Sequence, residues 1–172
     1  MSLFIPAYRF ERITDITAED FRKMGVKAVA LDVDNTLAAH NCPEPLKGVR
    51  DWLEKMQAAG MDMLIVSNNK AARVRPFADG LNLYFTTRAA KPLPVGFARC
   101  AKKLGIRCNE LAVIGDQIYT DILGANLCGA VSILVTPVSE EQGWSFRIRR
   151  KMEKKVLRRL DERSAGNREK RG

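Results

Sequence analysis

Two carboxylates, Asp32 and Asp34, follow an apolar stretch at residues 26–31 and are separated by a single residue. An apolar stretch without polar alternation is typical of a strand that is buried on both faces of a parallel sheet. Ligands of such sheets bind at the carboxyl ends of the strands, so both side chains would lie where a substrate binds. Because neighbouring carboxylates repel each other unless a cation or a shared proton relieves them, the pair predicts metal binding, acid/base chemistry or both.

Further polar side chains follow the later apolar stretches. Ser67, Asn68 and Asn69 come after one of them, and Lys91 stands in a loop after the next. Asp116 and Asp121 follow a third. Carboxylates without histidine or cysteine suit Mg²⁺, which prefers oxygen ligands. An aspartate can attack phosphorus, a second carboxyl group can protonate the leaving oxygen, and a lysine and a hydroxyl can bind the phosphoryl oxygens. The set therefore predicts phosphoryl transfer.

The elements that must position these groups alternate along the chain. The hydrophobic pattern and the capping signals predict strands at residues 26–31, 61–66, 81–86, 111–114 and 131–135, and helices at 17–24, 45–60, 70–78, 93–104 and 120–128. Strands separated by helices imply right-handed crossovers and a parallel sheet that is covered on both faces. We therefore predict an α/β fold, a three-layer doubly wound parallel sheet of the Rossmann-like kind, within one domain at residues 1–140.

In these residues and their order, the chain resembles the haloacid dehalogenase superfamily of phosphatases. The superfamily's strand-then-DxDxT signature matches DVDNT at residues 32–36, and its second and third elements match Ser67 and Lys91. The acidic element matches GDQIYTD at residues 115–121. The four elements occur in order and cover roughly residues 26–136.

The resemblance implies a role for each matching residue. Asp32 would be the nucleophile, and Asp34 the general acid and base. Magnesium would be held by Asp32, the main-chain carbonyl of Asp34, and Asp116. Ser67 and Lys91 would bind the phosphoryl group, and Lys91 would also screen the charge of Asp32. The ordinary alternative for aspartates at such places is a turn or helix cap.

The remaining candidates have less specific patterns. By resemblance, Asp121 and Thr36 would lie behind the metal ligands, with Asp121 reaching the ion through water; helix capping is the alternative for Asp121. Asn68 either binds the substrate phosphate or is a structural neighbour of the site. His40 and Cys42 fall in a predicted flap at residues 38–42, where His40 could touch substrate or be a solvated loop residue. No base accompanies Cys42, so we do not expect it to be a nucleophile.

The spacing of the elements leaves no room for a cap domain. The segments between the first and second elements, and between the second and third, are each too short for a folded domain of about 50 residues. A capless site would accept a bulky substrate, such as a lipid headgroup or a macromolecule, or be closed by a neighbouring subunit in a homo-oligomer. The details of the motifs are similar to the bacterial YqeG-type subfamily, which is related to mitochondrial phosphatidylglycerophosphate phosphatase. This resemblance implies a phosphatase, and more weakly a lipid phosphate substrate.

The positive charge is concentrated at the end of the chain. The net charge is +9, and residues 144–172 hold twelve Lys or Arg against four Asp or Glu. Apolar residues repeat every fourth position through residues 148–160, so we predict a basic amphipathic helical tail at 141–172, with a disordered end after Ser164. Residues 144–163 could lie on an anionic membrane surface, or the apolar stripe could dock on the body or on another subunit.

The basic tail also supports an alternative function, a nucleic-acid or ribosome-associated protein that uses the fold as a scaffold. No base-reading motif or aromatic platform accompanies the charge, so we favour the phosphatase. Deletion of residues 144–172 is expected to leave phosphatase activity on a soluble substrate and to abolish RNA binding. The sequence predicts no signal peptide, and it contains no apolar run of about 20 residues and no paired cysteine motif. We therefore predict a cytoplasmic protein, with peripheral membrane contact as an option.

Overall fold

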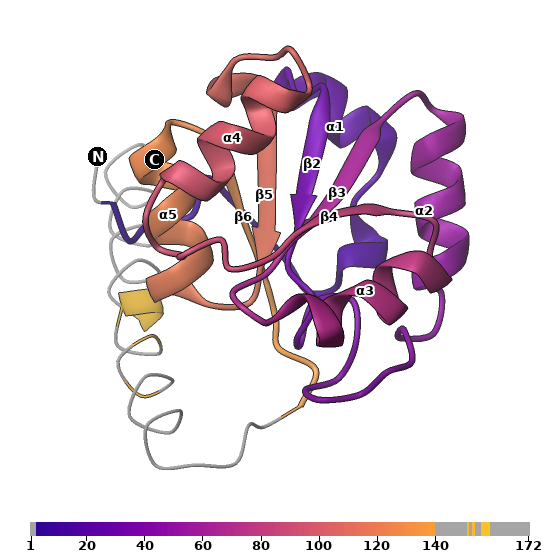
Figure 1. Ribbon diagram of the computed structural model, residues 1–172. Helices are drawn as coiled ribbons and strands as arrows, with labels where there is room; N and C mark the ends of the chain where they lie inside the picture. Colours follow the sequence, from indigo (N-terminus) through magenta and orange to yellow (C-terminus); the bar gives the residue numbers. More distant parts are fainter. Residues whose placement is uncertain (1–2, 140–150, 152, 154–155, 159–172) are drawn as a thin grey trace, which may run out of the picture.

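The centre of the fold is a parallel sheet with the strand order β1-β6-β5-β2-β3-β4 (Figure 1). The strands are β1 (Tyr8–Phe10), β2 (Ala28–Leu31), β3 (Asp62–Val66), β4 (Tyr84–Thr86), β5 (Leu111–Gly115) and β6 (Val131–Val135). The computed structural model describes residues 3–139, 151, 153 and 156–158 of the 172-residue chain. Within this part of the chain, the predicted α/β class and the parallel sheet are confirmed.

The order of the strands reverses beside β2. The chain runs outward from β2 through β3 to β4, then crosses back and continues through β5 and β6 on the other side. Ligands of open parallel sheets bind at such a reversal. Leu31, at the end of β2, is paired with Ile65 of β3 and Ile114 of β5. The residues that follow these three strands therefore meet at one edge of the sheet.

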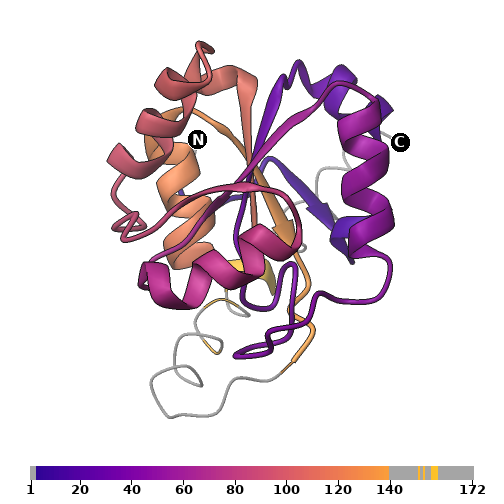
Figure 2. The ribbon, with the colours of Figure 1, turned by 45° about the vertical axis from the view of Figure 1, so that its right-hand side comes forward.

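Helices cover both faces of the sheet and give the three predicted layers (Figure 2). The helices are α1 (Ala18–Met24), α2 (Val49–Ala58), α3 (Ala71–Gly80), α4 (Val95–Lys103) and α5 (Leu123–Cys128). Val29 and Leu31 pack in the core with α1, α2 and α3. Ala28 and Ala30 pack in the core with α4 and α5. Because β2 is apolar on both faces, it is buried on both, as expected for a central strand.

The segment after β2 is a flap rather than a domain. The predicted helix at residues 45–60 begins only at Val49. Ahead of it, Ala38 bridges Pro45, and the Leu46 N–H donates to the carbonyl of Leu37. These contacts fold the chain back on itself over about ten residues. Between residues 3 and 139, where the description is continuous, no cap domain is inserted, so the capless prediction is confirmed.

Two further elements differ from the prediction. The edge strand β1 was not expected, because Tyr8, Arg9 and Phe10 show no buried pattern; its main chain pairs with β6. The helix expected at 120–128 is preceded by a π-helical segment, Ile118–Ile122, which continues directly into α5.

The described residues near the end of the chain, 151, 153 and 156–158, are helical. Val156 and Leu157 pack against Ile118, Ile122 and Leu134 of the body. In this part the docked alternative for the apolar stripe is therefore observed. The predicted boundary at residue 140, the rest of the tail and its expected disordered end lie outside the described residues. Among the described residues, no helix is both long and apolar enough to cross a membrane.

Candidate active site

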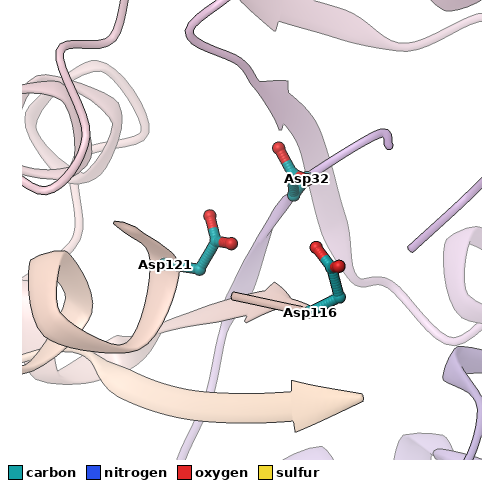
Figure 3. A group of neighbouring side chains, drawn as sticks. All are labelled: Asp32, Asp116 and Asp121. Carbon is teal, nitrogen blue, oxygen red and sulfur yellow. The ribbon is translucent and has the colours of Figure 1, made fainter. Parts of the chain in front are cut away.

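Three carboxylates converge at the carboxyl edge of the sheet. Asp32 follows β2, Asp116 follows the neighbouring strand β5, and Asp121 lies in the π-helical segment. One carboxylate oxygen from each residue lies within 4.8 Å of the other two. Figure 3 shows the three side chains directed into a common space. Asp116 and Asp121 are only 2% and 1% exposed, so these charges are held away from water. We call these three residues together with Lys91 the acidic cluster.

Lys91 is the cation of the acidic cluster. Its Nζ lies 2.5 Å from Oδ1 of Asp32 and 2.7 Å from Oδ1 of Asp121. The Asn68 side-chain amide fixes the main chain of Lys91 from both sides, accepting from its N–H at 2.8 Å and donating to its carbonyl at 3.0 Å. The described contacts of Asn68 thus match the structural alternative for this residue; contact with substrate stays a prediction.

Burial and charge act against each other in the acidic cluster. Burial raises the pKa of Asp32 to about 7, although the adjacent Lys91 ammonium opposes the rise. Burial alone would lower the pKa of Lys91, but the charges of Asp121 and Asp32 outweigh it and raise that pKa above its usual value. Lys91 is therefore charged at neutral pH, whereas Asp32 is near its titration midpoint when no cation is bound.

The end of β5 must be a glycine for Asp121 to enter the cluster. A Cβ at Gly115 would lie 2.3 Å from Cγ of Asp121, which is far inside van der Waals contact. The Gln117 N–H and the Thr120 hydroxyl lie 3.3 Å and 3.2 Å from Oδ2 of Asp121. The chain turns sharply after the strand, and this turn brings Asp121 back beside Asp116.

A second group surrounds Asp34 at the entrance of the site. Asn69 Nδ2 donates to Oδ2 of Asp34 at 3.0 Å, and the Asn41 N–H donates to Oδ1 at 3.2 Å. Arg73 Nη2 also donates to Oδ1, while His40 Nδ1 stands 3.7 Å away. We call Asp34, His40, Asn41, Asn69 and Arg73 the rim network. Asp34 follows β2, His40 and Asn41 belong to the flap, Asn69 lies in the loop after β3, and Arg73 lies in the first turn of α3. Asn41 and Arg73 are exposed.

The chain matches a known family of hydrolases. The family model for haloacid dehalogenase-like hydrolases matches residues 15–129. The chain belongs to this family. It is 35% identical over 154 residues to the probable phosphatase YqeG of Bacillus subtilis strain 168, and the match covers 90% of both chains. From its membership in this family and its similarity to this relative, the chain is a phosphatase of the haloacid dehalogenase-like hydrolases.

A more distant relative matches in sequence, and a solved structure matches in fold. Phosphatidylglycerophosphate phosphatase 1 of Arabidopsis thaliana is 26% identical over 166 residues; the match spans 90% of this chain but 47% of that protein. Among solved structures, the 4-nitrophenylphosphatase of Thermotoga maritima superposes with a TM-score of 0.57 at 12% identity, covering 71% of this chain and 89% of the other. At this identity the structural likeness shows the shared haloacid dehalogenase-like fold.

The other predicted residues of this hydrolase lie around the two groups. Ser67 follows β3, beside β2, and its buried hydroxyl accepts from the Asn69 N–H at 3.1 Å. Thr36 Oγ1 is buried without a hydrogen-bond partner among the described residues, in the wall of a cavity of about 220 Å³ beside Val135. Cys42 is a free thiol in the flap.

Arg73 and Asn41 were missed from the sequence, and Asn69 was noted beside Ser67 and Asn68 without a role of its own. Asn69 directly follows Ser67 and Asn68, and Arg73 lies in the first turn of the helix after them. A helix that follows a strand end starts at the ligand-binding edge, so polar residues of its first turn could have been considered. Asn41 gave no such signal, because only the folded flap brings it to Asp34.

Proposed function

We propose that the chain is a Mg²⁺-dependent phosphomonoesterase that works through an aspartyl-phosphate intermediate, an acyl phosphate formed at Asp32. The observation that carries the proposal is Lys91, held between Asp32 and Asp121 with Asp116 alongside. A carboxylate in this position is oriented by an ammonium group, and the ammonium can also attract the phosphoryl oxygens. An ion pair with only a structural role would not need the third carboxylate, Asp116, buried beside it.

The composition of the acidic cluster fits a divalent cation. With all three carboxyl groups ionised, the cluster including the Lys91 ammonium would carry a net charge of about −2 in a buried place, which is costly without a counter-ion. All available side-chain donors are oxygens, which suits Mg²⁺ better than a transition metal. Asp32, Asp116 and the main-chain carbonyl of Asp34 would hold the ion, with Asp121 and Thr36 behind them. When bound, the ion would neutralise charge on the phosphoryl oxygens.

The side chains can then divide two displacement steps between them. Asp32 attacks phosphorus, and the bond from phosphorus to the ester oxygen breaks as Asp34 transfers its proton to that oxygen. In the second step Asp34 takes a proton from water, whose oxygen attacks phosphorus and releases Asp32 and inorganic phosphate. Lys91 and Ser67 bind the phosphoryl oxygens throughout.

We favour a bulky phosphate ester as the substrate, with a phosphatidylglycerophosphate-like lipid as the first choice. The support is the open entrance of a capless site and the similarity to the plant phosphatidylglycerophosphate phosphatase, of which this chain matches about half the length. Any phosphomonoester whose remainder extends out of the entrance fits the same argument.

Replacement of the nucleophile tests the mechanism. Asp32→Asn should reduce turnover of a generic phosphomonoester, with Mg²⁺ present, by about ten-thousandfold or more, because an amide cannot form the intermediate. Asp62→Asn, an exposed aspartate at the start of β3, is the matched control and should keep wild-type activity. Similar turnover in both variants would refute the proposed nucleophile, and activity that survives EDTA would refute the metal requirement.

A further inference from the structure

A cleft of about 400 Å³ opens beside the rim network. Asn41, Asn69 and Arg73, three of the five rim residues, line it together with the buried side chains of Val74 and Phe77. The cleft thus has an apolar base and polar walls, with one cation, Arg73, and one carboxylate, Glu44, among its lining residues. It lies outside the acidic cluster, none of whose residues lines it.

The proposed chemistry directs the leaving group toward this cleft. Asp34 protonates the leaving oxygen, so the leaving alcohol must lie on the side of Asp34. Arg73 and Asn69 both contact Asp34 and both line the cleft. A leaving group more than a few atoms long would therefore extend across these two side chains.

Arg73 has donor capacity that Asp34 does not use. A guanidinium group has five N–H donors in a planar fork. In the structure Nη2 donates to Asp34 and Nη1 donates to Asn41. Asp34 is also held by Asn69 and by the Asn41 N–H. With 37% of its side chain exposed, Arg73 forms the kind of surface ion pair that stabilises a protein little, so holding Asp34 is a weak reason for an arginine here.

We propose that Arg73 binds a second anionic group, a phosphodiester or a carboxylate, carried by the leaving alcohol of the substrate. The inference rests on the proposed phosphatase mechanism and adds a recognition residue to it. The planar fork suits either anion, because both offer two oxygens to parallel N–H groups. Asn41 and Asn69 would supply the remaining polar contacts, and the apolar base would accommodate the carbon chain between the two anionic groups.

Three substrates with different leaving groups test this assignment. Ethyl phosphate has a neutral leaving alcohol, phosphoglycolate carries a carboxylate, and a water-soluble short-chain phosphatidylglycerophosphate carries a phosphodiester. In Arg73→Met, kcat/KM for at least one of the anionic substrates should fall about 10- to 100-fold more than kcat/KM for ethyl phosphate. This is the size of effect expected when a charge-assisted hydrogen bond to the substrate is lost. Arg73→Lys keeps the charge without the fork and should lie between Arg73→Met and the wild type.

The matched control is Arg75→Met, on the same helix, whose guanidinium lies over the Phe85 ring instead of the cleft. It should keep the wild-type ratio among the three substrates. A selective loss on the carboxylate, the phosphodiester or both supports the site and identifies the anion. An equal loss on all three substrates would show that Arg73 only positions Asp34, and no loss on any would also overturn the inference.

These outcomes are separate from a failure of the proposed function. If the wild-type protein hydrolyses none of the three esters, the phosphatase mechanism fails before Arg73 is considered. If it hydrolyses ethyl phosphate and Asp32→Asn abolishes that reaction, the mechanism stands, and the Arg73 ratios decide the leaving-group site alone. Thermal unfolding of each variant identifies any that loses activity through misfolding.

Discussion

Asp32 and Asp34 are two residues apart in the chain, but their surroundings differ in kind. Asp32 pairs with a buried lysine that comes from a loop 59 residues further on. Asp34 is held by polar groups from the flap, the loop after β3 and the first turn of α3, and Asn41 and Arg73 among them are exposed. The buried side is fixed before substrate arrives, whereas the exposed side can exchange contacts with it. We infer that the acidic cluster supplies the nucleophile and the metal ligands, and that the rim network supplies the general acid, Asp34, and the selectivity.

The largest effect that separates the two sides should come from the general acid. Asp34→Asn should lower kcat for ethyl phosphate by about 10²- to 10⁴-fold, because its alkoxide leaves poorly without a proton. For 4-nitrophenyl phosphate, whose leaving group needs little protonation, the loss should be much smaller. Asp32→Asn should show no such difference between the substrates. Rates for both variants on both esters are the measurement, and equal losses of Asp34→Asn on the two esters would contradict its role as the acid.

The next difference concerns stability. Lys91→Met leaves two buried carboxylates facing each other, so it should lower the free energy of unfolding of the metal-free protein by about 3 kcal/mol. Arg73→Met removes an exposed ion pair and should cost less than about 1 kcal/mol. Urea unfolding in EDTA measures both. Comparable losses would mean that the acidic cluster and the rim network are equally important for the fold, which would contradict the distinction between a buried, fixed side and an exposed side.

The pH dependence of stability should also distinguish the buried side. In the folded metal-free protein the pKa of Asp32 is about 7, against an ordinary value of 3.8. Between these values the folded state binds more protons than the unfolded state, so the free energy of unfolding falls as the pH rises through this window. The contribution is fully present below the lower value and lost above the higher one.

Asp32→Asn cannot titrate at this position and provides the reference. The stability of the wild type relative to Asp32→Asn should decrease from about pH 4 to about pH 7 in EDTA, as measured by urea unfolding. Added Mg²⁺ should restore the wild type at the upper end, because the ion favours the charged carboxylate. A stability difference that stays constant across this range would rule out the raised pKa.

The buried side was also the more predictable from sequence. Asp32 and Asp116 directly follow apolar strands, and adjacent parallel strands bring their ends together whatever the loops do. Lys91 and Asp121 were also singled out because they follow apolar stretches, and the resemblance gave their roles, but their mutual ion pair depends on two separate loops returning to the same edge. Asn41 was missed because its contact with Asp34 requires the flap to fold back, whereas Arg73 lies in the first turn of α3, at the same edge of the sheet.

The fold shows the same limit. Central strands such as β2 carry a continuous apolar signal, so their positions followed from the hydrophobic pattern. The edge strand β1 is held by main-chain pairing to β6, and its exposed residues carry no such pattern. The π-helical turn before α5 likewise reflects how Asp121 is brought beside Gly115, which is a tertiary requirement rather than a local preference.

The smallest predicted effect comes from the end of the chain. Glu153 is 4% exposed, and its Oε1 accepts from the N–H of Ile118 at 2.8 Å. Ile118 begins the π-helical segment that carries Asp121, so this bond helps to hold the buried side. Loss of the Glu153 carboxylate would leave the buried N–H of Ile118 without this acceptor. Glu153→Ala should therefore lower kcat/KM about tenfold and weaken activation by Mg²⁺.

Glu153→Gln keeps an oxygen acceptor and should recover most of the loss, whereas Lys151→Ala, at an exposed position of the same helical stretch, should match the wild type. Deletion of residues 144–172 should then reduce phosphatase activity, contrary to the expectation from sequence that the tail is separable. If Glu153→Ala and Lys151→Ala behave alike in Mg²⁺ titrations, the end of the chain has no part in positioning Asp121. The acidic cluster would then be held by the body alone, through Lys91 and the turn after β5.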